Sequence, residues 1–531
     1  MAVSDEKTTM TTTLEAAATS RDIKGGSFSP AASTVEHAEG GTAKDTAKWV
    51  ENGLVEREAR FMATVSEKES SRIYRKVDLR VIPMLTALYL IAHLDRANLG
   101  NAKLEGLEKD LGMVGNDYNI AVSVFFIPYI LFELPSNMVL ARFKRPSLYL
   151  SILVTGWGVS VLGSGFTDSF AGLCVCRCLV GVFEAGFLPA AFWLISQWYP
   201  PYRAQSRTGI FYFAAATSGA FSGLLAAAIA QMDGLAGKEG WRWIFIIEGC
   251  LSVLLGLGAY FLLPDTPALS TSWLAPEEIR YLELVFRATR GRNAATGTGQ
   301  EKPKKKVNWK ALRAMLTDKN LYLQSMIAAG SSLPNNGMKY TLPQIVKNMG
   351  YTSTKAQLLS VPPFMAAGLM TIVSSFWVDK RRSKKLPLIL LCQCMLLVGF
   401  SVLFALAPHI KDHIAVCYTF VVIACMGIYP IVPAASTWCI NNLAGPEKRV
   451  ASIGFFTTLA NLGGFLGSWV FLNTESPAYP TGFGTCLSFA AVGIICSLTV
   501  EWTYKRHNKK WRAFRQLEEM GDRSPLFKYI L

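Results

Sequence analysis

Ionisable side chains occur in segments of this sequence that are otherwise apolar. Two are adjacent in the first such segment, one lies in the second, two lie in the fourth and one lies in the sixth: Asp95, Arg96, Glu133, Arg177, Glu184 and Glu248. A charged side chain at the centre of a bilayer costs about 2.5–3.5 kcal/mol on insertion scales, and the intramembrane charges that proteins retain are usually functional. These residues are therefore the first candidates for function.

Together, these residue types could couple the movement of an anion to that of a proton. Arginine is always charged and can hold a carboxylate in fork geometry. A carboxylic acid beside it can exchange a proton when the charge of a bound anion competes for the arginine. Arg177 and Glu184 are seven residues apart, on one helix face and about 10 Å apart along its axis. Asp95 and Arg96 differ by about 100° around a helix, so they cannot both point at one partner. The set outlines a proton–anion symport site.

Structural roles compete with functional ones at several of these positions. Asp95 and Arg96 could instead form an ion pair that locks helices together. We expect Arg177 to be a buried residue that orients the acid on its helix. Glu133 precedes "LPSN" and is expected to be a gating or helix-packing partner, and Glu248 is expected to bridge to the neighbouring basic turns.

The spans of the second half carry mostly amides. The polar residues there are Asn335, Asn336, Lys339, Gln344, Gln393, Asn441 and Asn461. The run Asn335–Asn336–Gly337 predicts a break in the seventh span, and Lys339 could reach the outer interface or meet a substrate. In the first span His93 could titrate in an acidic medium, but a hydrogen-bonding role in the pocket lining is the favoured interpretation.

Composition places these residues in a membrane protein. Of the 531 residues, 51% are hydrophobic and 17% are charged, whereas a soluble globular protein carries about 25% charged residues. Several stretches are apolar for about 20 residues, the length that crosses a bilayer as a helix.

The net charge of +15 does not indicate nucleic-acid binding. The basic residues lie mainly in the loops that follow even-numbered spans, and no nucleic-acid-binding motif is present. The eleven cysteines form no CxxC pair and are expected to pack in the interior. No metal or cofactor site is predicted, and no HExxH or GxSxG motif indicates an enzyme.

The apolar segments predict twelve spans in two groups of six. The expected organisation is a disordered tail at 1–43, an amphipathic helical segment at 44–79, a six-helix half at 80–263, a linker at 264–319, a second six-helix half at 320–504 and a basic tail at 505–531. Basic residues follow the even-numbered spans, so the positive-inside rule puts the linker and both termini in the cytosol. The fold class is an all-α membrane protein.

A short basic turn recurs at the same place in each half. "NMVLARFKRPS" at 137–147 follows the second span, and "SFWVDKRRSKK" at 375–385 follows the eighth. This repeat resembles the loop pattern of the major facilitator superfamily, whose twelve helices form two six-helix halves around a site at the membrane midplane. The acid of that pattern is present as Asp379, close to Arg381, and is replaced by Ala141 in the first copy.

Four longer motifs narrow the resemblance. They are "HLDRANLGNAKLEGLEKDLGM", "FFIPYILFELPSN", "RCLVGVFEAGFLPA" and "GWRWIFIIEG". Over about residues 70–505 the chain is similar to the anion:cation symporter branch, and more narrowly to the fungal allantoate permease group, which includes nicotinate, pantothenate and biotin transporters.

The resemblance implies roles for particular residues. It makes Asp95 and Glu184 the protonation sites and makes Arg96 the residue that governs coupling and substrate. It also implies pocket roles for Tyr129, for Asn461 and for an aromatic residue in the tenth span, matched here to Trp438. His93 stands where relatives often carry tyrosine, so the polarity of this pocket departs from the pattern.

The resulting prediction is proton-coupled uptake of a small organic anion across the plasma membrane by a monomer, with nicotinate as the first candidate. The alternatives are an allantoate, pantothenate or other carboxylate permease, an exchanger or facilitator, and a nutrient sensor that keeps the fold without transporting. The absence of a Gly-Pro motif in the fifth span is evidence against a drug exporter.

Overall fold

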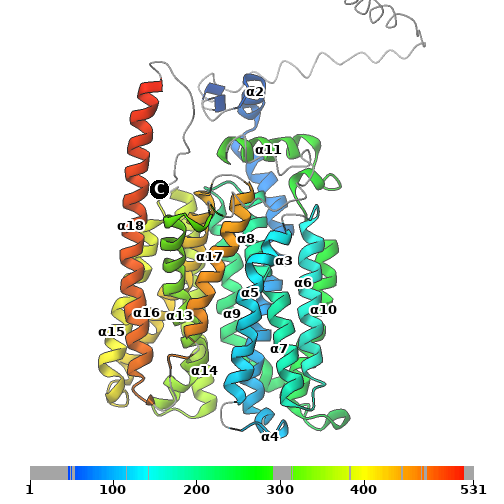
Figure 1. Ribbon diagram of the computed structural model, residues 1–531, viewed down its shortest axis with the longest axis vertical. Coiled ribbons are helices and arrows are strands. Elements are labelled where there is room, and N and C mark those ends of the chain that lie inside the picture. Colours follow the sequence, from blue (N-terminus) through cyan, green and yellow to red (C-terminus); the bar gives the residue numbers. More distant parts are fainter. Residues whose placement is uncertain are drawn as a thin grey trace, which may run out of the picture.

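The computed structural model is an all-helical bundle (Figure 1). It describes residues 46–518 except 48, 51–53, 115–116, 141–142, 291–312, 314, 382–383, 444–445, 468 and 472–474. No β-strand occurs in this part of the chain. The expected tail at 1–43 and the "KPKKK" run of the linker lie outside the described residues.

The first group of helices extends from α3 to α10. Its long helices are α3 (Glu67–Leu104), α5 (Asp117–Leu140), α6 (Pro146–Ser164), α7 (Phe170–Glu184), α8 (Phe187–Trp198), α9 (Ala204–Ala230) and α10 (Gly240–Leu262). The Ser66 hydroxyl accepts a hydrogen bond from the Glu69 amide at the start of α3, and the Glu69 carboxylate accepts one from the Ser66 amide. This capping box fixes the N-terminus of α3. The helix then continues past Pro83, so no helix end falls at residue 79, where the sequence placed a boundary.

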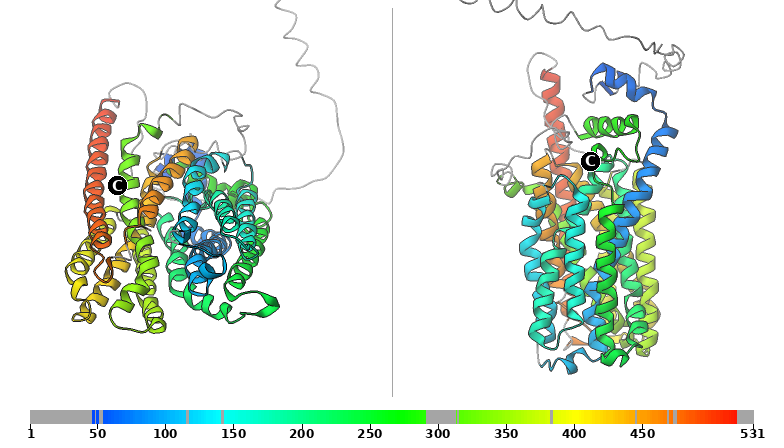
Figure 2. Two further views of the ribbon diagram at one scale, coloured as in Figure 1. Left: turned by 60° about the horizontal axis from the view of Figure 1, so that its bottom comes forward. Right: turned by 90° about the vertical axis from the view of Figure 1, so that its right-hand side faces the viewer.

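The second group extends from α13 to α18. Its helices are α13 (Lys319–Asn348), α14 (Ser353–Arg381), α15 (Leu386–Leu406), α16 (Ile414–Asn441), α17 (Pro446–Gly467) and α18 (Pro480–Glu518). The short connecting helices of the whole chain are α4 (Leu107–Asp110), η1 (Leu235–Gly237), η2 (Pro267–Leu269) and η4 (Ala407–His409). The left view in Figure 2 shows the two groups side by side.

Ten spans in the described part of the chain are long and apolar enough to cross a membrane. One of them joins α7 and α8. The other two of the twelve predicted spans correspond to α13 and α17. These two helices pack against each other. In α17 the apolar stretch Ala451–Gly467 is shorter than the other spans, and both helices carry amides and hydroxyls. Their polarity has a structural reason, because both line the cavity described below.

The fourth predicted span is divided at Ala185 and Gly186, between α7 and α8. A side chain at Gly186 would collide with the hydroxyls of Ser136 and Tyr149, so the close packing at this point requires glycine. Glu184 is the last residue of α7 and lies directly at the break. The division therefore places a carboxylate in the middle of the bundle.

The predicted break in the seventh span is wrong, because α13 runs without interruption through Asn335, Asn336 and Gly337. Gly337 instead permits close packing, since a side chain there would collide with the ring of Phe471.

A layer of polar contacts covers one end of the bundle, at the top of Figure 1. There α2 (Glu56–Thr64) and α11 (Pro276–Arg290) pack over the N-terminal part of α3, and we call this end the linker end. Arg287 pairs with Glu58 at 2.8 Å and Lys76 pairs with Glu278 at 2.6 Å. Partial burial opposes the ionisation of Glu278, but the hydrogen bonds from Lys76 and from the Ala275 amide, together with the charge of Lys76, outweigh it and lower the pKa of its carboxyl. These pairs attach the linker helix to the first group.

The two groups also meet at the linker end. The Asp379 carboxylate on α14 accepts hydrogen bonds from the Ser206 amide at 2.7 Å and from the Ser206 hydroxyl at 2.6 Å, at the N-terminus of α9. Gln205 hydrogen bonds to Thr437 on α16. A carboxylate at a helix N-terminus also interacts favourably with the helix dipole. The second copy of the basic turn thus joins the groups through its acid, whereas the exposed Arg381 stacks on Trp377 at 5.3 Å.

Candidate functional site

A cavity with an empty volume of about 510 Å³ lies between the two groups. The first group contributes Tyr89, His93, Arg96, Leu188, Phe192 and Tyr212 to its lining. The second group contributes Ser332, Asn335, Asn336, Val432, Phe456, Thr457, Ala460 and Asn461. The wall from the first group is mostly aromatic with one guanidinium group, and the wall from the second is rich in amides and hydroxyls. Such a cavity has the mixed polarity of a small-molecule site.

An ion pair forms part of the wall of this cavity. The Arg96 Nε donates to the Glu184 Oε1 at 2.6 Å, and the Glu184 side chain is 2% exposed. The guanidinium also lies over the rings of Phe125, at 5.3 Å, and Tyr129, at 4.8 Å. Aromatic rings in these positions favour a cation. Tyr129 is 1% exposed and supports Arg96 from behind rather than lining the cavity.

A second cation enters from the other group. The Lys339 Nζ on α13 donates to the His93 backbone oxygen at 3.1 Å and lies 3.2 Å from the His93 Nδ1. The His93 ring in turn packs edge-on against Tyr89, with ring centroids 4.6 Å apart. Lys339 therefore reaches across the boundary between the groups, and neither of these two contacts is with a carboxylate.

Glu133 and Asn461 also meet across that boundary. The Asn461 Nδ2 on α17 donates to the Glu133 Oε1 at 3.0 Å and to its Oε2 at 3.2 Å. Glu133 on α5 is fully buried. Both residues are predicted site positions, and the structure brings them together.

Asp95 faces away from the cavity. The Ser252 hydroxyl on α10 donates to the Asp95 Oδ2 at 2.8 Å, and Asp95 is 1% exposed. The adjacent residues Asp95 and Arg96 thus have different partners, as expected from their angular separation. Arg177 is buried, lies over the ring of Phe245 at 5.5 Å, and is among the charged neighbours of both Asp95 and Glu184.

Two predicted positions have surroundings that differ from the expected ones. Glu248 accepts a hydrogen bond from the Asn98 Nδ2 at 2.9 Å inside the first group, rather than reaching a basic turn. Trp438 is 1% exposed and packs against Tyr504 with centroids 6.0 Å apart, and it does not line the cavity.

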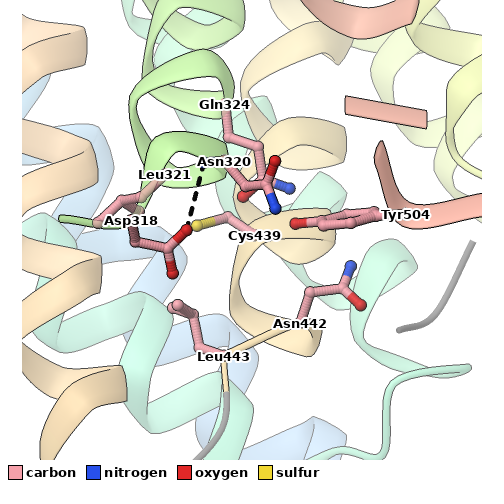
Figure 3. Close-up of a pocket in the computed structure, with 8 residues that line it drawn as sticks. All are labelled: Asp318, Asn320, Leu321, Gln324, Cys439, Asn442, Leu443 and Tyr504. Carbon is pink, nitrogen blue, oxygen red and sulfur yellow. Dashed lines mark hydrogen bonds between the residues drawn. The ribbon is translucent and has the colours of Figure 1, made fainter. Parts of the chain in front are cut away.

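A smaller pocket of about 220 Å³ lies elsewhere, where α13, α16 and α18 meet (Figure 3). Asp318 caps α13 there by accepting a hydrogen bond from the Asn320 amide at 3.2 Å. Its lining comes from the second group alone and contains neither lysine nor arginine. The cavity that contains Arg96 is therefore the better candidate for an anion site. Among the described residues no cluster of three or more His, Cys, Asp or Glu could hold a metal ion.

The comparison with protein families assigns the fold. The family model described as the Major Facilitator Superfamily matches residues 85–468. The chain belongs to the major facilitator superfamily. This confirms the predicted fold class of two six-helix halves, and the family consists of transporters rather than enzymes, also as predicted.

Similar proteins come from fungi. The MFS-type transporter cnsO of Penicillium expansum is 34% identical over 479 residues, covering 87% of this chain and 90% of that protein. The high-affinity nicotinic acid transporter of Saccharomyces cerevisiae is 28% identical over 493 residues, covering 89% of each chain. The predicted relationship to fungal transporters of this superfamily is thus confirmed.

Solved structures share the fold at low identity. The proton:xylose symporter XylE bound to 6-bromo-6-deoxy-D-glucose matches with a TM-score of 0.61 and 16% identity, covering 78% of this chain and 94% of that one. The human organic anion transporter MFSD10 (TETRAN) matches with a TM-score of 0.55 and 15% identity, covering 80% of this chain and 99% of that one. The family match over residues 85–468 and the apolar spans together show that the chain is a multi-pass membrane transporter of small molecules.

Several cavity residues were not selected from the sequence. Tyr89, Phe192, Tyr212 and Phe456 are aromatic residues in apolar segments, where nothing in the sequence distinguishes a cavity wall from a lipid-facing surface. Lys339, which lies beside the cavity residue His93, does carry a usable signal, because a lysine in the middle of a span is costly.

Proposed function

We propose that the protein imports a small organic monoanion together with a proton. The observation that carries this proposal is the ion pair between Arg96, which lines the cavity, and the buried Glu184 behind it. An ionised Glu184 and a substrate carboxylate would compete for the same guanidinium. A protonated Glu184 is a poor competitor, because it has lost its charge and one oxygen has become a donor. Proton binding would thus free Arg96 to hold the anion.

The cavity lining favours a small planar anion. Arg96 supplies a cation to the lining, and the rings of Tyr89, Phe192 and Tyr212 supply apolar walls. Lys339 adds a second cation from the other half, beside the lining residue His93. Asn335, Asn336 and Asn461 offer hydrogen bonds from the opposite side. We propose nicotinate as the first substrate to test. The nicotinic acid transporter among the similar proteins supports this choice, and allantoate, pantothenate and other carboxylates are the competitors to test beside it.

Alternating access would then connect binding to transport. A carboxylate bound between Arg96 and Lys339 contacts both halves at once, and the halves of such transporters rock against each other around a central site. We propose a monomer in the plasma membrane with both termini in the cytosol. The basic residues at the linker end support this orientation.

Uptake of labelled nicotinate into transporter-deficient yeast tests the proposal at acidic and neutral external pH. Acid-stimulated uptake is expected in the wild type, and both Glu184→Gln and Asp95→Asn should lose the acid stimulation while remaining at the cell surface. Unlabelled carboxylates added as competitors define the substrate. Uptake whose rate is independent of pH and is unchanged by the two substitutions would contradict proton coupling and would favour a facilitator.

A further inference from the structure

A ladder of polar side chains connects α3 and α10 behind the cavity. Asp95 and Asn98 lie three residues apart on α3, and Glu248 and Ser252 lie four residues apart on α10, so each pair occupies one helix face. The Ser252 hydroxyl donates to Asp95 at 2.8 Å, and the Asn98 amide donates to Glu248 at 2.9 Å. All four residues are at most 2% exposed. The ladder is therefore sealed from solvent inside the first half.

This ladder has more hydrogen-bond acceptors than donors. The second carboxylate oxygens of Asp95 and Glu248, Oδ1 and Oε1, and the amide oxygen of Asn98, Oδ1, are buried without a hydrogen-bond partner among the described residues. Leaving a buried polar atom unsatisfied costs about 1–3 kcal/mol, and more for a charged group. A proton on either carboxylate would convert one unsatisfied acceptor into a donor.

The charges in the ladder favour the same proton. Glu248 is the charged group that acts most strongly on Asp95, and the other charged groups facing Asp95 are Glu184 and Arg177 on α7. The neighbouring α6 has no charged residue, and the single charged residue of α9, Arg207, pairs with Asp78 at 2.6 Å. Two adjacent carboxylates in a medium of low dielectric constant cannot both ionise cheaply.

We infer that Asp95 and Glu248 share one proton, and that Glu248 sets the pH at which Asp95 takes up and releases it. This inference rests on the proposed function and adds to it a residue that does not line the cavity. Glu248 is a positioning residue, because it acts on transport through Asp95. The ladder would then act as a proton store beside the pair of Arg96 and Glu184.

The test compares four proteins in proteoliposomes: the wild type, Glu248→Gln, Ser252→Ala and Glu501→Gln. Labelled nicotinate uptake is measured across a pH series. Glu248→Gln removes a negative neighbour of Asp95 and should move the pH of half-maximal uptake down by about one unit. Ser252→Ala removes the donor to ionised Asp95 and should move it upward by a smaller amount. Glu501→Gln, a buried glutamate on α18 of the other half, should leave it unchanged.

A second readout needs no substrate. If the folded ladder holds a proton that the unfolded chain releases, the thermal unfolding midpoint of the purified wild type should fall as the pH rises, because that proton is lost. Glu248→Gln should flatten this dependence, and Glu501→Gln should keep it. If Glu248→Gln does not fold, the upward shift expected for Ser252→Ala decides the question instead.

The outcomes separate this inference from the proposed function. If Glu184→Gln abolishes acid stimulation but Glu248→Gln keeps the wild-type pH of half-maximal uptake and the wild-type stability profile, the inference is wrong and proton coupling stands. If the rate of wild-type uptake does not depend on pH, the proposed function is wrong, and so is the role of Glu248 in transport.

Discussion

The two halves contribute different chemistry to one cavity. The first half supplies the ion pair of Arg96 and Glu184, with Asp95 and Glu248 buried behind it. The second half supplies amides, hydroxyls and Lys339. Carboxylates can change protonation state near neutral pH when buried, whereas amides cannot. Under the proposed function, the carboxylates of the first half would handle the proton, and both halves would contact the substrate.

The largest effect is expected at Arg96, where the two tasks meet. Truncating one partner of a buried, hydrogen-bonded charge pair costs about 2–5 kcal/mol of binding, so the loss of the contact between Arg96 and the anion in Arg96→Ala should reduce the initial rate of uptake by about 100-fold or more. Arg96→Lys should also be strongly impaired, because lysine keeps the charge but loses the planar fork. Initial uptake rates at matched surface expression measure both effects.

Arg506 offers a matched control, since it also lies over an aromatic ring, that of Trp502 at 5.3 Å, but is exposed on α18. Arg506→Lys should transport normally. Normal uptake by Arg96→Lys would show that charge alone is sufficient, and a carboxylate held in fork geometry would then be excluded.

A smaller effect is expected at Lys339 and would sharpen the comparison. A hydrogen bond to a charged group contributes about 1.5–3 kcal/mol, so Lys339→Gln should raise KM for the transported anion by about 10-fold or more while keeping the acid stimulation of uptake. The exposed Lys347 on the same helix provides the control, Lys347→Gln. A variant at Lys339 that shifts the pH profile and leaves KM unchanged would place proton handling in both halves.

The sequence predicted which residues carry the chemistry better than it predicted which residues they contact. The cost of charge in a membrane identifies Asp95, Arg96 and Glu184 without a structure, and helical periodicity shows that the first two must diverge. Periodicity does not say which helix each one faces. The pairing of Arg96 with α7 and of Asp95 with α10 depends on how helices far apart in the chain pack.

The same limitation explains the predictions that the structure did not support. The sequence predicted that Glu248 bridges to the neighbouring basic turns, but in the folded protein its partner is Asn98, which is distant in the chain. The run at 335–337 predicted a helix break from local propensity, which is a weak signal that packing often overrides. There the close approach of α13 to Phe471 accounts for the glycine.

The smallest effect is expected outside the membrane, at the pair of Lys76 and Glu278 on the linker end. Its 2.6 Å contact is partly exposed, with 36% and 17% of the two side chains accessible, so after solvent screening it should contribute about 0.5–1 kcal/mol. Glu278→Gln should lower the thermal unfolding midpoint of the purified protein slightly at neutral pH and leave uptake unchanged.

The pH dependence of this difference has a definite sign. Burial opposes ionisation of Glu278, but the hydrogen bonds from Lys76 and the Ala275 amide and the nearby positive charges together lower its pKa below the ordinary value of 4.5. A group whose pKa is lower in the folded state stabilises the fold above its unfolded value, and that contribution is lost as the pH falls through the folded value. The wild type and Glu278→Gln should therefore converge below pH 4.5, while the exposed neighbour variant Glu277→Gln matches the wild type throughout. A loss of uptake in Glu278→Gln at unchanged stability would instead mean that the linker layer takes part in the movement of the halves.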